Sequence, residues 1–301
     1  MEGALERWCV TFLGSAPASE LFRTGHLSEV VAVALVDGRE VVIKIRAPSR
    51  RLAASVQVQR HLRSRGYPCP DVLAGPEPFG ELMATAETHV PAHGTPPEPP
   101  PPEPTAQLLA ALVDSAPPAN EFPALNPAPP WVGWDHPGDS LWPWPDDLDI
   151  DLNRHPGPDW IDDTAQRIRA RLAAETSPAV IGHADWEAHN LDWDGATPVL
   201  VHDWDSVAIR AEAAIAGAAA TVYPSNGTTA VAATIEQTAA FLDAYARARP
   251  SQWSRRANET AWCAGLWVIT YNAKKETLGG GTGYLEHLER EHAERSSLAG
   301  I

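Results

Sequence analysis

The residues that could act as catalytic groups or metal ligands are concentrated between 183 and 206, HADWEAHNLDWDGATPVLVHDWDS. Two strand-like runs, NLDW and VLVHDW, flank the turn-rich DGATP and predict a hairpin. In such a hairpin Asn190 lies at the start of the first strand and Asp203 at the end of the second, so their side chains converge. Their oxygens are hard ligands that suit Mg²⁺. Asp185, just upstream, is free to accept a proton from a substrate hydroxyl, so the stretch favours metal-assisted phosphoryl transfer.

Two other metal chemistries compete for the same stretch. The segment from Asn190 begins like an EF-hand calcium loop, but Val201 occupies the position where that loop needs a bidentate glutamate, which excludes it. A zinc or di-metal hydrolase site is an alternative because good ligands are abundant, although no HExxH motif occurs. The candidate ligands for that alternative are His183, Asp185, His189, His202, Asp203 and Asp205.

The elements that must position these residues begin near the N-terminus. Residues 30–46, VVAVALVDGREVVIKIR, predict two strands joined at Asp37-Gly38, and the second strand carries Lys44. A helix is predicted over 49–65, followed by short strands over 72–79 and 81–88. Further helices are predicted at 160–174, 232–247, 258–275 and 283–297.

The middle of the chain has a different composition. Of the forty residues from 91 to 130, fourteen are proline, and the run PPEPPPPEP predicts a polyproline-like spacer rather than a helix. Five tryptophans follow among several aspartates. They either pack the insert onto the core, which we favour, or hold an amine through cation–π contacts. These tryptophans are Trp131, Trp134, Trp142, Trp144 and Trp160.

Taken together, these segments resemble a known family. HADWEAHN matches the catalytic-loop pattern His-x-Asp-x-x-x-x-Asn, and HDWDS matches the metal-binding element after the following hairpin. Both are similar to motifs of the aminoglycoside phosphotransferase and choline kinase-like superfamily of small-molecule kinases. VVIKIR, RGYPCPDVL and FLDAYARA resemble further segments of these proteins. The resemblance covers about residues 20–90 and 160–275 and is weakest across the insert.

The resemblance implies an α+β, two-lobe, protein-kinase-like fold. A small antiparallel-sheet N-lobe with one helix precedes a larger, mainly helical C-lobe. The implied boundaries are 1–88 for the N-lobe, 89–105 for the hinge and Pro-rich linker, and 106–301 for the C-lobe. Within the C-lobe the implied segments are the catalytic loop 183–190, the metal element 202–206 and the Pro/Trp-rich insert 117–160.

The resemblance also implies roles for individual residues. Asp185 is expected to be the catalytic base, and His183 to brace the loop near Asp203. Asn190 and Asp203 are expected to bind Mg²⁺. ATP or GTP would lie with its phosphates on Lys44 and its base against backbone groups of the hinge, from Glu87 to Val90. The remaining nucleotide-site residues are Gly25 and Ser28 over the phosphates, with Gln59, Glu87 and His89. Those expected to support the site or contact substrate are Asp205, Glu187 and Trp186.

One residue expected from the resemblance is missing. Kinase-like sites pair the strand lysine with a helix glutamate, but no Asp or Glu occurs from Ile45 to Pro70. We expect Gln59 to hydrogen-bond Lys44 in its place, which would hold the lysine less firmly. A catalytically weak or inactive kinase-like nucleotide-binding protein is therefore an alternative function. The complete set of Asp185, Asn190 and Asp203 favours a working enzyme.

The composition of the whole chain limits its partners. A net charge of −16 disfavours nucleic acid, and no apolar run approaches the roughly 20 residues of a membrane helix. The N-terminal residues lack a signal-peptide pattern and the three cysteines are far apart, so we expect free thiols and a cytoplasmic location. The acidity and the tryptophan-rich insert favour a small hydroxyl substrate that is cationic, such as an amino sugar or another amine-bearing alcohol. Oligomeric state is left open.

Overall fold

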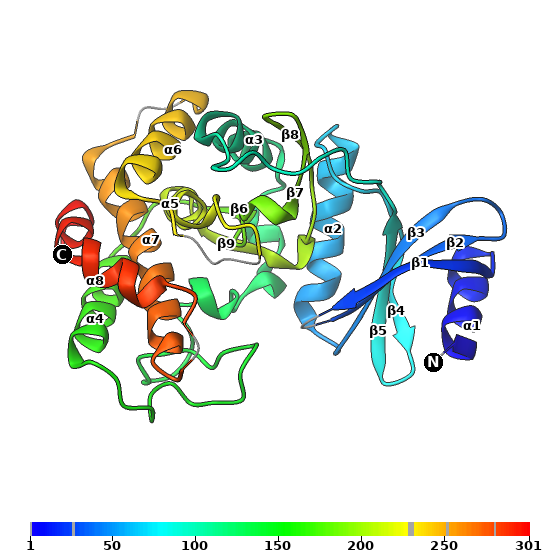
Figure 1. The fold of residues 1–301 in the computed structure, drawn as a ribbon, viewed down its shortest axis with the longest axis horizontal. Helices are drawn as coiled ribbons and strands as arrows, with labels where there is room; N and C mark the ends of the chain where they lie inside the picture. The colour runs from blue at the N-terminus through cyan, green and yellow to red at the C-terminus, as the bar shows by residue number, and fades with distance from the viewer. Residues whose placement is uncertain (1, 26–27, 228–231, 251–252, 280) are drawn as a thin grey trace.

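The structure is a computed structural model that describes residues 2–25, 28–227, 232–250, 253–279 and 281–301. It consists of two lobes, an N-lobe built on a sheet and a larger helical C-lobe, joined by an extended linker (Figure 1). The α+β kinase-like architecture expected from the sequence is confirmed. None of the helices in these described ranges is both long and apolar enough to span a membrane.

The N-lobe sheet is antiparallel, with the strand order β1-β2-β3-β5-β4. The predicted hairpin is β2 and β3, and the two short predicted strands are β4 and β5. The element bounds are α1 (Glu2–Leu13), β1 (Pro17–Gly25), β2 (Glu29–Leu35), β3 (Glu40–Arg46), α2 (Arg50–Ser64), β4 (Val72–Phe79) and β5 (Leu82–Thr88).

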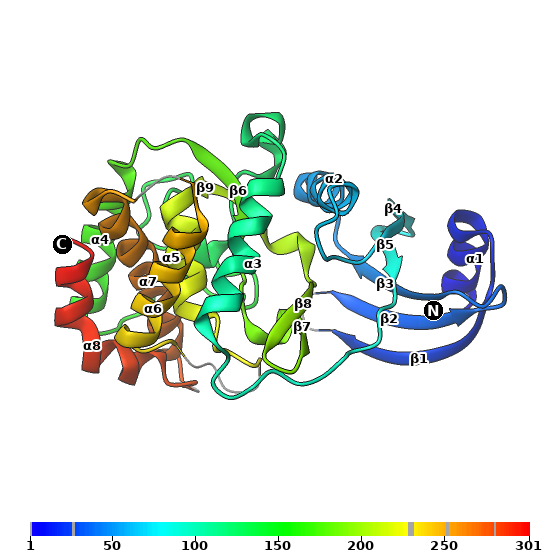
Figure 2. The ribbon, with the colours of Figure 1, turned by 90° about the horizontal axis from the view of Figure 1, so that it is seen from above.

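The alternation along β3 gives the sheet two different faces. Val41, Ile43 and Ile45 are buried in a core that also contains Trp8 of α1. The opposite face carries Lys44 and Arg46, because successive side chains of a strand point to opposite sides. The expectation of one N-lobe helix was therefore incomplete, since α1 covers the apolar face. The second helix, α2, lies between the sheet and the C-lobe (Figure 2).

The C-lobe packs its helices around a large apolar core. Helix α5 (Glu212–Val222) is almost entirely buried and crosses α7 (Arg255–Glu276) closely: a Cβ on Gly217 would lie 1.9 Å from the carbonyl oxygen of Ala261. This close approach explains the small residues of α5. The other C-lobe helices are α3 (Pro102–Ser115), α4 (Asp159–Ala173), α6 (Ile235–Ala248) and α8 (Tyr284–Leu298).

Two short antiparallel pairs carry the segment from 183 to 206. Strand β6 (Ala179–His183) pairs with β9 (Val207–Ala211), and β7 (Leu191–Asp194) pairs with β8 (Thr197–Val201). The second pair is the predicted hairpin. Strands β6 and β9 were not among the predicted elements.

The C-terminal end of the proline-rich run is helical, which differs from the prediction. Helix α3 begins at Pro102, so the final prolines of PPEPPPPEP form its first turn. Proline is tolerated there because the first N–H groups of a helix have no intrahelical acceptor. The expectation that the whole run excludes helix was therefore wrong, and the irregular part of the linker ends at 101.

The tryptophan-rich insert packs onto the C-lobe, as the favoured interpretation expected. Trp142 is 1% exposed and its ring lies 5.5 Å from that of Trp267 in α7. The cations near these rings belong to the protein itself: Arg210 lies over Trp134, and Lys274 over Trp142. The aromatic and acidic groups of the insert are thus largely occupied by internal contacts.

Candidate active site

The catalytic loop is fixed by His183 at the end of β6. The His183 ring is fully buried, and its Nε2 lies 3.0 Å from the carbonyl oxygens of both His202 and Asp203. Its Nδ1 lies 3.3 Å from the backbone N–H of Asp185, which acts as the donor. The expected bond near Asp203 is therefore present. One side chain connects the loop that carries Asp185 to the segment that carries Asp203.

Tryptophan indoles enclose the same loop. The rings of Trp186 and Trp204 lie edge-on to His183. The Trp186 indole N–H donates to the carbonyl of Thr105 in α3, 3.2 Å away, and that of Trp131 in the insert donates to the carbonyl of Ala184, 3.0 Å away. Because Trp186 is 0% exposed, the structure favours the first of its two expected roles, support of the loop, over contact with a substrate.

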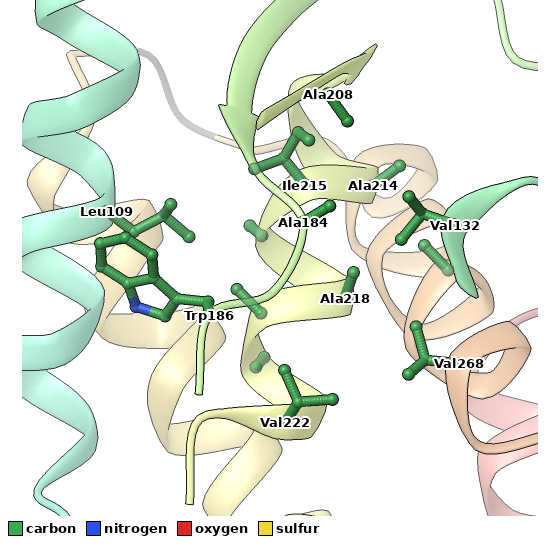
Figure 3. Close-up of a cluster of buried hydrophobic side chains, with 14 of the residues drawn as sticks. Leu109, Val132, Ala184, Trp186, Ala208, Ala214, Ile215, Ala218, Val222 and Val268 are labelled. Carbon is green, nitrogen blue, oxygen red and sulfur yellow. The ribbon is translucent and has the colours of Figure 1, made fainter. Parts of the chain in front are cut away.

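Figure 3 shows how the C-lobe core supports the loop from behind. Trp186 lies beside Leu109 of α3, and Ala184 lies over the small side chains of α5. Ala184 also donates its N–H to the carbonyl of Ser206, 2.9 Å away. The labelled core residues are Leu109, Val132, Ala184, Trp186, Ala208, Ala214, Ile215, Ala218, Val222 and Val268.

The hairpin brings Asn190 next to Asp185. The N–H of His202, just after β8, donates to the carbonyl of Asn190, just before β7, and so closes the hairpin at 2.9 Å. The Asn190 side-chain amide donates to the Asp185 carboxylate at 2.9 Å and to its backbone carbonyl at 3.0 Å. These bonds commit the amide nitrogen, so the amide oxygen of Asn190 is the atom left for a cation.

The backbone of Asp203 adopts a conformation that is uncommon for residues other than glycine. Its φ of 57° and ψ of 53° lie in the left-handed region, which Asp tolerates better than most side chains. Its carboxylate accepts a hydrogen bond from Ser206 Oγ at 3.0 Å. Burial opposes ionisation, but Lys44, His183 and Arg46 together lower the pKa of Asp203 below its usual value. The carboxylate therefore stays charged beneath two cations of the N-lobe.

The environment of Asp185, unlike that of Asp203, favours the protonated form of the carboxyl group. Burial, followed by the charges of Glu187 and Asp203, raises the pKa of its carboxyl to about 8, although His189 and Asn190 act in the other direction. Several carboxylates thus share a small volume, and a bound cation would relieve their repulsion. The oxygen donors of Asn190 and Asp203 fit Mg²⁺ in type.

Lys44 is held by a glutamate of the sheet. Its Nζ lies 3.1 Å from Glu87 Oε1, and the two side chains are 12% and 9% exposed. The Gln59 amide nitrogen donates to Glu87 Oε2 and to the carbonyl of Pro70, both at 3.0 Å. The expected direct bond from Gln59 to Lys44 is therefore wrong. Gln59 instead contacts the carboxylate that pairs with the lysine.

Strand pairing limits the nucleotide contacts that were expected at the hinge. Glu87 lies within β5, and its side chain is turned to Lys44. The N–H of Thr88 donates to the carbonyl of Asp71 at 2.9 Å, and that of His89 to the carbonyl of Glu40 at 3.0 Å. The His89 ring also contacts the Glu40 carboxylate. The strand pairing thus extends to His89, and the N–H groups of Thr88 and His89 are used within the protein. Contact of a nucleotide base with the other backbone groups of the hinge, up to Val90, stays a prediction.

Gly25 is the last residue of β1, and Ser28 directly precedes β2. This end of the β1–β2 pair faces the C-lobe (Figures 1 and 2). The two residues between Gly25 and Ser28 are outside the described ranges. Gly25 has a φ of 153°, and a Cβ there would lie 2.0 Å from the carbonyl oxygen of Ser28. Only glycine therefore fits at this position, where the chain turns back closely on itself. Their expected contact with phosphates stays a prediction.

Glu187 lies beside the catalytic aspartate. Its carboxylate accepts a hydrogen bond from Ser225 Oγ at 2.8 Å and lies 3.1 Å from His189 Nδ1. The Glu187 side chain is 18% exposed. It is therefore partly accessible, and its expected contact with a substrate stays a prediction.

Two arginines that link the lobes were given no role in the sequence-based prediction of the site. Arg46, two residues after Lys44 on the same face of β3, forms an ion pair with Asp205 of the metal element. Arg51, in the first turn of α2, donates to backbone carbonyls of the C-lobe. The alternation of β3 could have placed Arg46 beside Lys44, but nothing local in the sequence indicated its partner. The carbonyl acceptors of Arg51 are those of Leu125, Pro127, Asp205 and Val207.

The metal-hydrolase alternative finds no support in this geometry. Among the residues that the structure describes, no group of three or more His, Cys, Asp or Glu side chains is arranged to hold a metal ion. His202 instead lies 3.2 Å from Asp192 of the hairpin, and His183 is committed to backbone groups.

Comparisons with known proteins agree with the fold and the site. The sequence model of the phosphotransferase enzyme family matches residues 20–257, so the chain belongs to that family. It is a kinase-like small-molecule phosphotransferase, similar to aminoglycoside and macrolide phosphotransferases and to choline kinase-like proteins. No curated protein sequence matches the chain.

Solved structures share the fold over nearly the whole chain. A type I macrolide 2'-phosphotransferase is 17% identical with a TM-score of 0.61, and the match covers 99% of this chain and 97% of that one. Amicoumacin kinase in complex with AMP-PNP, Ca²⁺ and Ami is 10% identical, with a TM-score of 0.64 and coverage of 98% and 94%. A putative fructosamine-3-kinase from Thermobifida fusca is 16% identical, with a TM-score of 0.58 and coverage of 98% of each chain.

Proposed function

We propose that the protein transfers the γ-phosphoryl group of ATP or GTP, bound with Mg²⁺, to a hydroxyl of a small molecule. The observation that carries this proposal is the convergence of four groups from both lobes: Lys44, Asp185, Asn190 and Asp203. They come from β3, the catalytic loop and the two ends of one hairpin. Phosphoryl transfer needs this combination of a phosphate-binding cation, metal ligands and a carboxylate that orients the nucleophile.

The residues divide the work in the following way. Lys44 would bind the α- and β-phosphates, and Asn190 and Asp203 would hold Mg²⁺, which would supply positive charge opposite the phosphate oxygens. Asp185 orients the acceptor hydroxyl and receives its proton. The hydrogen bond from Asn190 to Asp185 keeps the base next to the metal site.

The acceptor side of the site is acidic. Asp185 and Glu187 lie on the same loop; the contact with Glu187 raises the pKa of His189, and the charged imidazolium offsets one of these two carboxylates. This environment favours an acceptor with an amine near its hydroxyl, such as an amino sugar. The tryptophans of the insert contribute less to this proposal than the sequence suggested, because Trp134 and Trp142 are already in contact with Arg210 and Lys274.

The test is a calorimetric titration with ATP and with GTP, each with and without Mg²⁺, on the wild type and on Asp203→Asn. We expect binding that depends on Mg²⁺ and is weakened by the substitution. A screen of amino-alcohol acceptors then looks for phosphorylated product. Binding that is indifferent both to Mg²⁺ and to Asp203→Asn would instead favour a kinase-like binding module.

A further inference from the structure

We propose that Glu87 is the positioning residue for Lys44, in place of a helix glutamate, and that Gln59 sets the orientation of Glu87. The proposal rests on the proposed phosphotransferase function. The helix facing Lys44 offers no carboxylate, since no Asp or Glu occurs from Ile45 to Pro70. The carboxylate comes instead from the neighbouring strand β5.

The register of the sheet explains why Glu87 reaches the lysine. In the antiparallel pair of β3 and β5, Lys44 is opposite Thr85 and Val42 is opposite Glu87. Glu87 is thus a diagonal neighbour of Lys44 on the same face, within the reach of two long side chains. A distance of 3.1 Å between Nζ and Oε1 shows that the two groups meet. Since the strands are hydrogen-bonded to each other, the pairing is built into the sheet.

Gln59 supplies the second half of the arrangement. The carbonyl of Pro70 can only accept a hydrogen bond, so the Gln59 amide must turn its nitrogen toward it. The same nitrogen then donates to Glu87 Oε2 and leaves Oε1 for Lys44. A glutamate at position 59 would bring a negative charge to both acceptors. Glutamine at this position is therefore the complement of a glutamate on β5, and not a weakened helix glutamate.

Burial strengthens the electrostatic interaction between Lys44 and Glu87. Gln59 is 3% exposed and the two charged side chains are nearly as enclosed, so solvent screens the pair little. Without Glu87 the ammonium group of Lys44 would turn toward Asp203, whose charge already faces it. Glu87 thus keeps Lys44 between the sheet and the metal element, where phosphates bind.

The experiment measures the dissociation constant of Mg²⁺–AMP-PNP by calorimetry in a double-mutant cycle. The variants are Glu87→Gln, Lys44→Met and the combination of the two. Gln59→Met is a milder variant that keeps both charges and removes only the amide donor. Glu77→Gln, on β4 of the same sheet, is the matched control for loss of a carboxylate, and circular dichroism checks that each variant is folded.

We expect Glu87→Gln to weaken binding about tenfold, which corresponds to about 1.4 kcal/mol, because the lysine loses a charged hydrogen-bond partner. Gln59→Met should weaken binding less, and Glu77→Gln should not change it. In the Lys44→Met background, Glu87→Gln should have no further effect, because it acts through the lysine. An equal loss in both backgrounds, or no loss in the wild-type background, overturns the proposal. Absence of nucleotide binding by the wild type overturns the proposed function itself.

Discussion

Arg46 of β3 and Asp205 of the metal element form an ion pair that joins the two lobes across the nucleotide site. Arg46 is the second cation on the face of β3 that carries Lys44. Burial lowers the pKa of Arg46, but the nearby charges of Asp203 and Glu87 favour its charged form. The strand that carries Lys44, the proposed phosphate-binding residue, is therefore linked directly to the segment that carries Asp203, the proposed metal ligand.

Asp185→Asn should lower kcat for phosphoryl transfer by about 10²–10⁴-fold while leaving the dissociation constant of the nucleotide nearly unchanged. The substitution keeps the shape of the side chain but removes its ability to accept the hydroxyl proton. Asp194→Asn, an exposed aspartate in the following hairpin, is the control and should retain wild-type turnover. Undiminished turnover in Asp185→Asn would contradict the assignment of the base.

Arg51→Met should lower the free energy of unfolding by about 3 kcal/mol, because it removes a largely buried guanidinium and leaves its carbonyl acceptors unpaired. Arg50→Met is the matched control, since Arg50 is the exposed neighbour on the same helical turn, and its effect should stay within about 0.5 kcal/mol. Urea denaturation of both variants measures the difference. Equal effects of the two substitutions would show that the bonds from Arg51 to the C-lobe do not contribute to stability.

Trp142→Ala should destabilise the protein by about 3–5 kcal/mol, because this ring is 1% exposed and packs on Trp267. Trp144→Ala, in the same insert, should change stability by less than about 0.5 kcal/mol, because Trp144 is 58% exposed. Thermal and urea denaturation distinguish the two. A large effect of Trp144→Ala would mean that the insert packs differently.

Glu175 should make stability depend on pH in the acid range. Burial alone would raise its pKa, but hydrogen bonds from Thr260, Ser177 and the backbone lower the pKa to about 2, from 4.5. A lowered folded-state pKa adds stability that is present above pH 4.5 and is lost as the pH falls toward 2.

The stability difference between the wild type and Glu175→Gln should therefore shrink as the pH falls through this window. Urea denaturation at a series of pH values measures it. Glu121→Gln, at an exposed site, is the control. A difference that stays constant across the window would contradict the interpretation of Glu175.

Local patterns were sufficient to predict much of the fold. The Asp37-Gly38 turn and its β-branched flanks defined the β2–β3 hairpin, and the catalytic-loop motif placed Asp185 and Asn190 next to each other. Helix α1 was missed although its buried face contains Trp8 and Leu13, because it packs mainly on β4, a strand distant in sequence.

The partner of Lys44 could not be predicted for a related reason. A helix glutamate is found by its spacing, whereas Glu87 reaches Lys44 through the register of β3 and β5, which only the folded sheet fixes. The same limit applies to Arg51, whose acceptors are backbone carbonyls more than seventy residues away along the chain. Backbone acceptors leave no trace in the side-chain pattern.

The bonds of Arg51 give the two lobes a connection besides the linker. They attach the first turn of α2 to the C-lobe. Further along the same helix, Gln59 donates to Glu87 and Arg60 donates to the carbonyl of Gly75, both in the sheet. Helix α2 therefore contacts both lobes, and it ties the Lys44–Glu87 pair to the C-lobe through a path of hydrogen bonds that is independent of the linker.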